Sequence, residues 1–144
     1  MPVCTRRLEF DSAHRVMLHE SKCRHLHGHR YVAEVTVAAS ELDDLGRVID
    51  FSCIKELVGG WIDAELDHGT LANDNDHDLI ELCRDSEWKV YTMPCNPTAE
   101  NIARLLFEKG NELLCGKGVW VTHVRIYETP NCWADYWENT DNEI

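Results

Sequence analysis

Residues 27–39 read HGHRYVAEVTVAA, and every second side chain in this run is a histidine, an aromatic or an aliphatic residue. Side chains two residues apart on a β-strand point to the same face, and β-branched and aromatic residues favour strands. The run therefore predicts a strand with one buried face. The residues on that face are His27, His29, Tyr31, Ala33, Val35 and Val37.

Residues 7–14, RLEFDSAH, alternate in the same way and predict a preceding strand. Its inward face carries Leu8, Phe10, Ser12 and His14. The spacing of apolar residues then lengthens to that of helices, and polar residues predict a loop between the two helices. We expect helices at 49–66 and 96–114, a loop at 66–78, and closing strands at 119–128 and 132–137; residues 89–93 are compatible with a short strand.

The expected order is strand, strand, helix, helix, strand, strand, within a single domain over residues 1–144. Neither helix joins two adjacent strands in the manner of a parallel crossover. We therefore expect an α+β fold, in which an antiparallel four-stranded sheet is covered by two helices on one face.

The composition excludes two kinds of partner. The chain has 26 acidic and 14 basic residues and a formal net charge of −12. Sequence-independent binding to nucleic acid or to an anionic membrane needs a basic surface, so we expect neither. No apolar run is long enough for a membrane helix or a signal peptide, and we expect a soluble, cytoplasmic protein. The seven cysteines lack CxxC spacing and are expected to be reduced.

Basic residues are enriched between His14 and Arg30. This segment contains a single acid, Glu20, and four basic residues, which we call the positive island: Arg15, Lys22, Arg24 and Arg30. Charge alone does not separate a functional patch from a chance fluctuation along a solvated loop.

His27 and His29 are two residues apart on a strand, so their side chains converge on one side of it. His14 lies at the end of the preceding strand and is the best candidate for a third ligand. A catalytic zinc site uses three protein ligands and keeps a fourth position open. We predict a three-histidine zinc site, although an HxH pair alone more often marks two ordinary histidines.

Cys23 lies in the same octapeptide, KCRHLHGH, and leaves two alternatives open. A thiolate is a good zinc ligand, so Cys23 and the three histidines could form a closed structural site. Alternatively, Cys23 lies beside the metal as a base or nucleophile. The spacing does not decide between them.

Three further residues are candidates for chemistry. Asp67 and His68 are neighbours at the end of the first helix, where a carboxylate could orient an imidazole that transfers protons. A histidine that stabilises the helix end is the simpler alternative. Glu128 ends an apolar strand. It is either an exposed strand end or a carboxylate that accepts two N–H groups from a planar heterocycle.

Several motifs together resemble the 6-pyruvoyl-tetrahydropterin and 6-carboxy-tetrahydropterin synthase family, which has the tunnelling fold. The segments FDSAH, CRHLHGH, VIDF, LDH, NPTAEN and VRIYET occur in the order of that family and cover nearly the whole chain. The spacing CxxxHGH from Cys23 to His29 is similar to that of the 6-carboxy enzymes of queuosine and 7-deazapurine biosynthesis. The 6-pyruvoyl enzymes typically have a longer gap.

The resemblance implies a role for each candidate residue. It makes His14, His27 and His29 the zinc ligands, Cys23 the catalytic base, Asp67 and His68 its proton-transfer partners, Glu128 the pterin anchor and Thr98 part of the pterin pocket. The implied enzyme is a lyase that converts 7,8-dihydroneopterin triphosphate to 6-carboxytetrahydropterin and releases acetaldehyde and triphosphate. The positive island would then hold the triphosphate.

The resemblance also implies an assembly. Trimers whose sheets close into a barrel would stack into a homo-hexamer, which removes exposed sheet edges. Active sites would lie between subunits. Two alternatives remain: a 6-pyruvoyl-tetrahydropterin synthase, which eliminates triphosphate without cutting the side chain, and a zinc-stabilised binding module that is not an enzyme.

Overall fold

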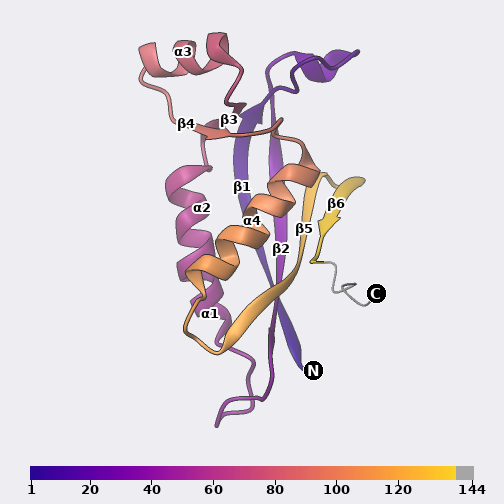
Figure 1. Ribbon diagram of the computed structural model, residues 1–144, viewed down its shortest axis with the longest axis vertical. Coiled ribbons are helices and arrows are strands. Elements are labelled where there is room, and N and C mark those ends of the chain that lie inside the picture. Colours follow the sequence, from indigo (N-terminus) through magenta and orange to yellow (C-terminus); the bar gives the residue numbers. More distant parts are fainter. Residues whose placement is uncertain (139–144) are drawn as a thin grey trace, which may run out of the picture.

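A mixed six-stranded sheet forms the framework of the computed structural model, which describes residues 1–138 (Figure 1). Residues 139–144 of the expected domain lie outside the described residues. The sheet order is β4-β3-β1-β2-β5-β6. The strands are β1 (Val3–His14), β2 (His27–Ala39), β3 (Gly69–Asn73), β4 (Val90–Met93), β5 (Val119–Thr129) and β6 (Cys132–Tyr136).

The predicted α+β class is confirmed, but the prediction of a four-stranded antiparallel sheet is wrong. The four expected strands pair antiparallel in the order β1-β2-β5-β6. In addition, β3 pairs in parallel with the last three residues of β1, and β4 pairs in parallel with β3. The first four residues of β3 are all buried, so this strand lacks the alternation by which the others were predicted.

A third helix, α3 (His77–Asp85), is present in addition to the two expected ones and connects β3 to β4 as a parallel crossover. Its buried residues Leu79, Ile80 and Cys83 pack with Ala72 of β3 in a small second core. Their helical spacing was the available signal. Because acidic and amide residues surround this short stripe, the segment resembled a polar loop.

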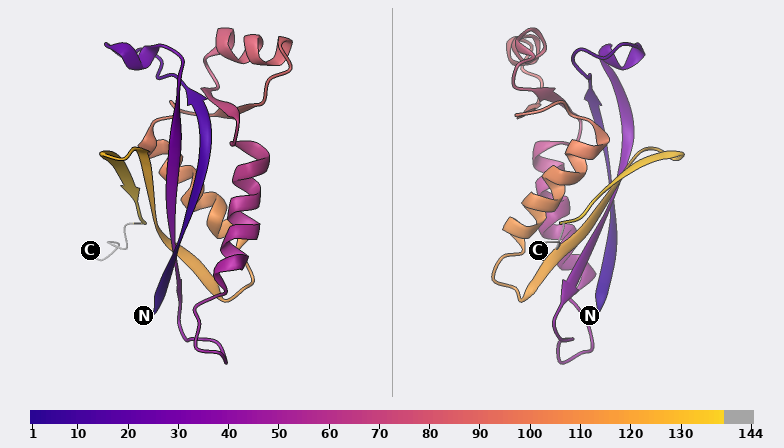
Figure 2. Two further views of the ribbon diagram at one scale, coloured as in Figure 1. Left: turned by 180° about the vertical axis from the view of Figure 1, so that it is seen from behind. Right: turned by 45° about the vertical axis from the view of Figure 1, so that its right-hand side comes forward.

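The other helices cover one face of the sheet (Figure 2). The first is continuous through α1 (Phe51–Ile54), a π-helical segment η2 (Lys55–Gly59) and α2 (Gly60–Glu65). Asp50 caps it, because its Oδ1 accepts a hydrogen bond from the Ser52 amide at 2.9 Å. The second is α4 (Ala99–Leu113). Among the described residues, no helix is long and apolar enough to cross a membrane.

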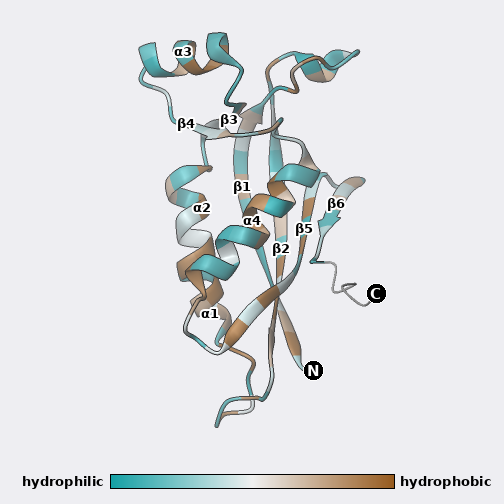
Figure 3. Cartoon of the chain, viewed as in Figure 1, coloured by the Kyte–Doolittle hydropathy of each residue, from teal (hydrophilic) through white to brown (hydrophobic). Residues whose placement is uncertain are grey.

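The main core lies between these helices and the inward face of β1, β2 and β5. The predicted inward residues of β1 are all buried, and Tyr31, Ala33, Val35 and Val37 of β2 are fully buried. Figure 3 shows hydrophobic residues along β2 and β5 and, alternating with hydrophilic ones, along α4. The loop of residues 15–26, with a short 3-10 helix η1 (Lys22–Arg24), projects from the same end of the sheet as α3 (Figures 1 and 2).

Close packing of α4 on β5 generates a prediction about two helical glycines. A Cβ on Gly110 would lie 2.9 Å from Cγ2 of Val121, whereas a Cβ on Gly60 would meet nothing within 4 Å. Alanine is favoured over glycine in helices by about 1 kcal/mol, but overpacking costs roughly 1–3 kcal/mol. In thermal unfolding, Gly60→Ala should raise the Tm and Gly110→Ala should lower it. An equal rise for both variants would contradict this account of the interface.

Candidate metal centre

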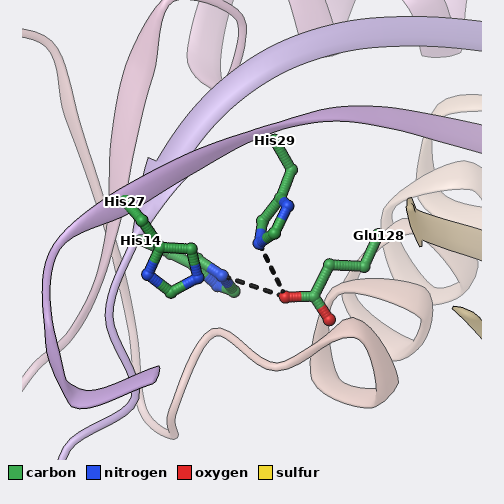
Figure 4. A group of neighbouring side chains, drawn as sticks. All are labelled: His14, His27, His29 and Glu128. Carbon is green, nitrogen blue, oxygen red and sulfur yellow. Dashed lines mark ion pairs between the residues drawn. The ribbon is translucent and has the colours of Figure 1, made fainter. Parts of the chain in front are cut away.

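The ends of β1, β2 and β5 bring three histidines and a glutamate together (Figure 4). The register of β1 with β2 places His14 opposite His27 and Ser12 opposite His29, so the three imidazoles share one end of the inward face. Glu128 comes from β5. One ligand atom from each of the three histidines and from Glu128 lies within 4.8 Å of the others. The three histidines predicted as ligands are therefore neighbours.

Backbone carbonyls orient two of the imidazoles. Nδ1 of His14 lies 2.6 Å from the Pro97 carbonyl oxygen, and Nδ1 of His27 lies 2.6 Å from the His25 carbonyl oxygen. A carbonyl oxygen can only accept, so each Nδ1 carries the proton and each neutral ring presents a lone pair on Nε2. Metal-binding histidines are commonly held by such a hydrogen bond at the other nitrogen.

The ring nitrogens that face the centre of the cluster are unsatisfied. Nε2 of His14 and Nε2 of His29 are buried and make no hydrogen bond to any described residue. They lie 3.1 and 3.0 Å from Oε1 of Glu128, within ion-pair distance but without hydrogen-bond geometry. Buried polar atoms without a partner are uncommon, and a bound cation would satisfy both nitrogens and the carboxylate at once.

The protonation state of the histidines also suits a metal. Burial lowers the pKa of His14, and the Pro97 carbonyl and the Glu128 carboxylate oppose this effect without cancelling it. Burial likewise lowers the pKa of His29, again against the Glu128 carboxylate. Neutral imidazole is the form that binds metals. A donor set of imidazoles with one carboxylate fits a first-row transition metal better than Mg²⁺ or Ca²⁺, which prefer oxygen ligands.

Cys23 lies outside this ligand cluster. It is partly buried in η1, and its sulfur does not belong to the group of ligand atoms within 4.8 Å of one another, while Glu128 does. Its carbonyl oxygen accepts a hydrogen bond from the Val16 amide at 2.9 Å, which closes the loop back on β1. Among the described residues, the sulfur of Cys23 is therefore not grouped with the three histidines as a fourth ligand atom.

Asp67 and His68 form a second constellation. Nδ1 of His68 lies 2.7 Å from Oδ2 of Asp67, and Oδ1 of Asp67 accepts a hydrogen bond from the Asp11 amide at 2.9 Å. Burial acts to raise the pKa of Asp67, but the Asp11 amide, His68 and Lys89 outweigh it and lower that pKa. His68 has a φ of 56°, uncommon for a residue other than glycine, and its amide donates to the Asp11 carbonyl at 2.7 Å.

This pair and the histidine cluster lie on opposite faces of β1. The Asp11 carboxylate belongs to the cluster of Asp67 and His68, and adjacent residues of a strand point to opposite faces. Ser12 and His14 therefore face the helices, while Asp11 faces outward. His68 lines an open groove of about 580 Å³ beside β1. The lining of this groove includes Asp11, Gly28, Arg30, Trp88 and Lys89, together with Ser12 and His29 of the inward set.

The structure places the two expected substrate-binding residues near the histidine cluster. The Glu128 side chain is 27% exposed and faces two imidazoles, so it is not simply an exposed strand end. It could be a fourth ligand or a substrate contact. Thr98 caps α4 through a 3.2 Å hydrogen bond from the Asn101 amide and directly follows Pro97. The sequence pattern revealed neither the Pro97 carbonyl, which acts through the backbone, nor Asp11, whose amide and carboxylate meet Asp67 and His68 only through pairing of distant segments.

The positive island is only partly available to a ligand. Arg15 donates to the buried carboxylate of Asp76, with Nε 2.6 Å from Oδ2, and this ion pair lowers the pKa of Asp76. Arg30 pairs with two carboxylates on β1, each at 3.0 Å, those of Glu9 and Asp11. Within residues 1–138, the island's other two members, Lys22 and Arg24, have no acidic partner.

Comparisons with known proteins find relatives along nearly the whole chain. A curated 6-carboxy-5,6,7,8-tetrahydropterin synthase of Rickettsia felis is 46% identical over 136 residues, which cover 92% of this chain and 97% of the relative. A 6-pyruvoyl tetrahydropterin synthase structure from Caenorhabditis elegans superposes with a TM-score of 0.70 at 28% identity, covering 96% of this chain and 97% of the other.

A structure of an uncharacterized protein from Wolinella succinogenes has the same fold, with a TM-score of 0.82 at 24% identity over 95% of this chain and 98% of the other. The model of one protein family, described as 6-pyruvoyl tetrahydropterin synthase, matches residues 3–139. With this match over nearly the whole chain, the protein belongs to the 6-pyruvoyl tetrahydropterin synthase family.

Proposed function

We propose that this protein is a zinc-dependent 6-carboxy-5,6,7,8-tetrahydropterin synthase. It would convert 7,8-dihydroneopterin triphosphate to 6-carboxytetrahydropterin, with release of acetaldehyde and triphosphate, in cytoplasmic queuosine and 7-deazapurine biosynthesis. The observation that carries the proposal is the convergence of three imidazoles with two buried, unpartnered ring nitrogens. The name of the curated relatives at 44 and 46% identity supports the choice of the carboxy product.

His14, His27 and His29 would hold the zinc ion. When bound, zinc supplies a Lewis acid that eases removal of protons from the hydroxyls and carbons of the substrate side chain. Glu128 would accept hydrogen bonds from the ring N–H groups of the pterin, each worth about 1.5–3 kcal/mol to a charged group. Its position against the imidazoles supports a role at the centre of the site.

Cys23, as a thiolate, would take a proton from the substrate side chain. The exclusion of its sulfur from the ligand cluster supports this role over that of a fourth ligand. His68 would donate or accept the next proton, with Asp67 holding its Nδ1–H at 2.7 Å so that Nε2 is free to exchange. Thr98 would line the pterin pocket. Lys22 and Arg24 are the members of the positive island that would contact the triphosphate.

Active sites between subunits are part of the proposal. In one chain, Asp67 and His68 lie on the outward face of β1, while the histidines lie on the inward face. In a single chain, Asp67 and His68 are therefore accessible to a neighbouring chain. This supports sharing of each site between chains. We propose a homo-hexamer, a dimer of barrel-forming trimers, in which the pair serves Cys23 of a neighbouring chain. The groove beside His68 would receive that neighbour.

The product distinguishes the proposal from its main rival. Incubation with 7,8-dihydroneopterin triphosphate should release acetaldehyde and triphosphate in equal amounts, measured by chromatography together with the pterin product. A 6-pyruvoyl-tetrahydropterin synthase releases triphosphate but leaves the carbon side chain whole. Triphosphate with a pyruvoyl pterin and no acetaldehyde would therefore assign the rival activity.

Two variants separate a metal ligand from a base. Cys23→Ala should keep one zinc ion per chain on the three histidines and lose turnover by roughly 10²–10⁴-fold, the usual contribution of general acid–base catalysis. His27→Ala should lose the metal under either interpretation and serves as the control. Zinc content and turnover are measured on both. Loss of zinc from the Cys23→Ala variant would show that Cys23 is a zinc ligand and would refute its proposed role as the catalytic base.

Mixed assemblies test whether two chains share each site. Cys23→Ala and His68→Ala should each be inactive alone. Co-expressed at equal levels, they should recover about one quarter of wild-type activity, because about one site in four then combines an intact Cys23 with an intact His68 from its neighbour. Activity that stays at the level of the single variants would place both residues of each site on one chain.

A further inference from the structure

The side-chain amide of Asn96 pairs with the backbone of Met17 in both directions. Its Oδ1 accepts a hydrogen bond from the Met17 amide at 3.2 Å, and its Nδ2 donates to the Met17 carbonyl at 3.1 Å. The side chain of Asn96 therefore pairs with the backbone of Met17 as a neighbouring strand would, although Asn96 lies outside the sheet. Oδ1 also accepts from Nδ2 of Asn73 at the end of β3, at 3.0 Å.

Met17 begins the part of the loop that carries Cys23. The preceding residue, Val16, donates its amide to the Cys23 carbonyl at 2.9 Å. Asn96 is thus linked to the backbone of Cys23 by its hydrogen bonds to Met17, by the peptide bond between Val16 and Met17, and by the hydrogen bond from Val16 to the Cys23 carbonyl. The following residue, Leu18, has a φ of 62° and is 98% exposed. A left-handed leucine without packing is locally unfavourable, so this turn depends on contacts elsewhere.

Asn96 itself is held from the other side. Its carbonyl oxygen accepts hydrogen bonds from Nδ2 of Asn101 at 2.9 Å and from the Thr98 amide at 2.8 Å, at the start of α4. The next carbonyl, that of Pro97, accepts from Nδ1 of His14. The dipeptide Asn96–Pro97 therefore contacts both the loop of Cys23 and a histidine of the metal centre, and α4 anchors it.

We propose that Asn96 is a positioning residue that sets Cys23 against the histidine cluster. This inference rests on the proposed function, in which Cys23 is the base. Its physical basis is that proton transfer needs the two heavy atoms within hydrogen-bond reach, and a displacement of about 1 Å can cost roughly 100-fold in rate.

Asn111 provides a matched control elsewhere in the fold. Its Oδ1 accepts from the Val121 amide at 2.9 Å and its Nδ2 donates to the Val121 carbonyl at 3.3 Å, so it makes the same two-way pairing between α4 and β5. Replacing either asparagine by aspartate keeps the size and the acceptor but removes the donor. Replacing it by alanine removes both.

The experiment compares Asn96→Asp and Asn96→Ala with Asn111→Asp and Asn111→Ala. We expect both Asn96 variants to retain the metal and to lower kcat by roughly 10- to 100-fold with little change in KM. Hydrogen exchange of the amides in residues 15–26 should become at least about tenfold faster. The Asn111 variants should lower the Tm about as much as the Asn96 variants do. Their kcat and the hydrogen exchange of residues 15–26 should stay near the wild-type values.

The outcomes separate the two proposals. If wild-type protein does not turn over 7,8-dihydroneopterin triphosphate, the proposed function fails, and exchange in residues 15–26 still decides whether Asn96 holds the loop. Unchanged exchange in both Asn96 variants overturns the positioning role. A fall in kcat no larger than that of the Asn111 variants also overturns it, because the effect would then be one of general stability.

Discussion

The antiparallel register between β1 and β2 is the constraint on which the candidate site depends. It sets His14 opposite His27 and Ser12 opposite His29, and thereby brings three imidazoles to one end of the inward face. A slip of one residue would turn this whole set to the other face. Large apolar residues on the same faces, with Phe10 and Tyr31 stacked at 5.2 Å between ring centroids, oppose such a slip. Core packing and ligand geometry are therefore one requirement.

The segment that leads into α4 adds a second constraint on the candidate site. Through hydrogen bonds of 2.6–3.2 Å, the three residues before the helix act in turn: Pro97 orients His14, Asn96 binds the loop of Cys23, and Thr98 caps the helix. A strand pair can present imidazoles on a face but cannot select which ring nitrogen points inward. The Pro97 carbonyl makes that selection for His14, because it can only accept a proton donor.

The metal centre and the pair of Asp67 and His68 approach β1 from different sides. Within one chain, the Asp11 carboxylate beside Asp67 and His68 points away from the face of β1 that carries His14. The proposed sharing of each site between two chains would make assembly a condition of activity. The same outward face pairs Arg30 with two acids of β1, which leaves Lys22 and Arg24 as the island's cations without an acidic partner in residues 1–138.

The sequence by itself determined the long strands and their inward faces, and it placed His14, His27 and His29 on those faces, because a period of two along the chain fixes which side chains share a face. It also placed Asp67 beside His68. Only the tertiary structure decided that β3 pairs in parallel with β1, that Glu128 faces the imidazoles, and that Arg15 is bound to buried Asp76. These features depend on pairing between distant segments. Periodicity along the chain carries no record of which segments pair, so the charges and carboxylates of the site could be assigned only in three dimensions.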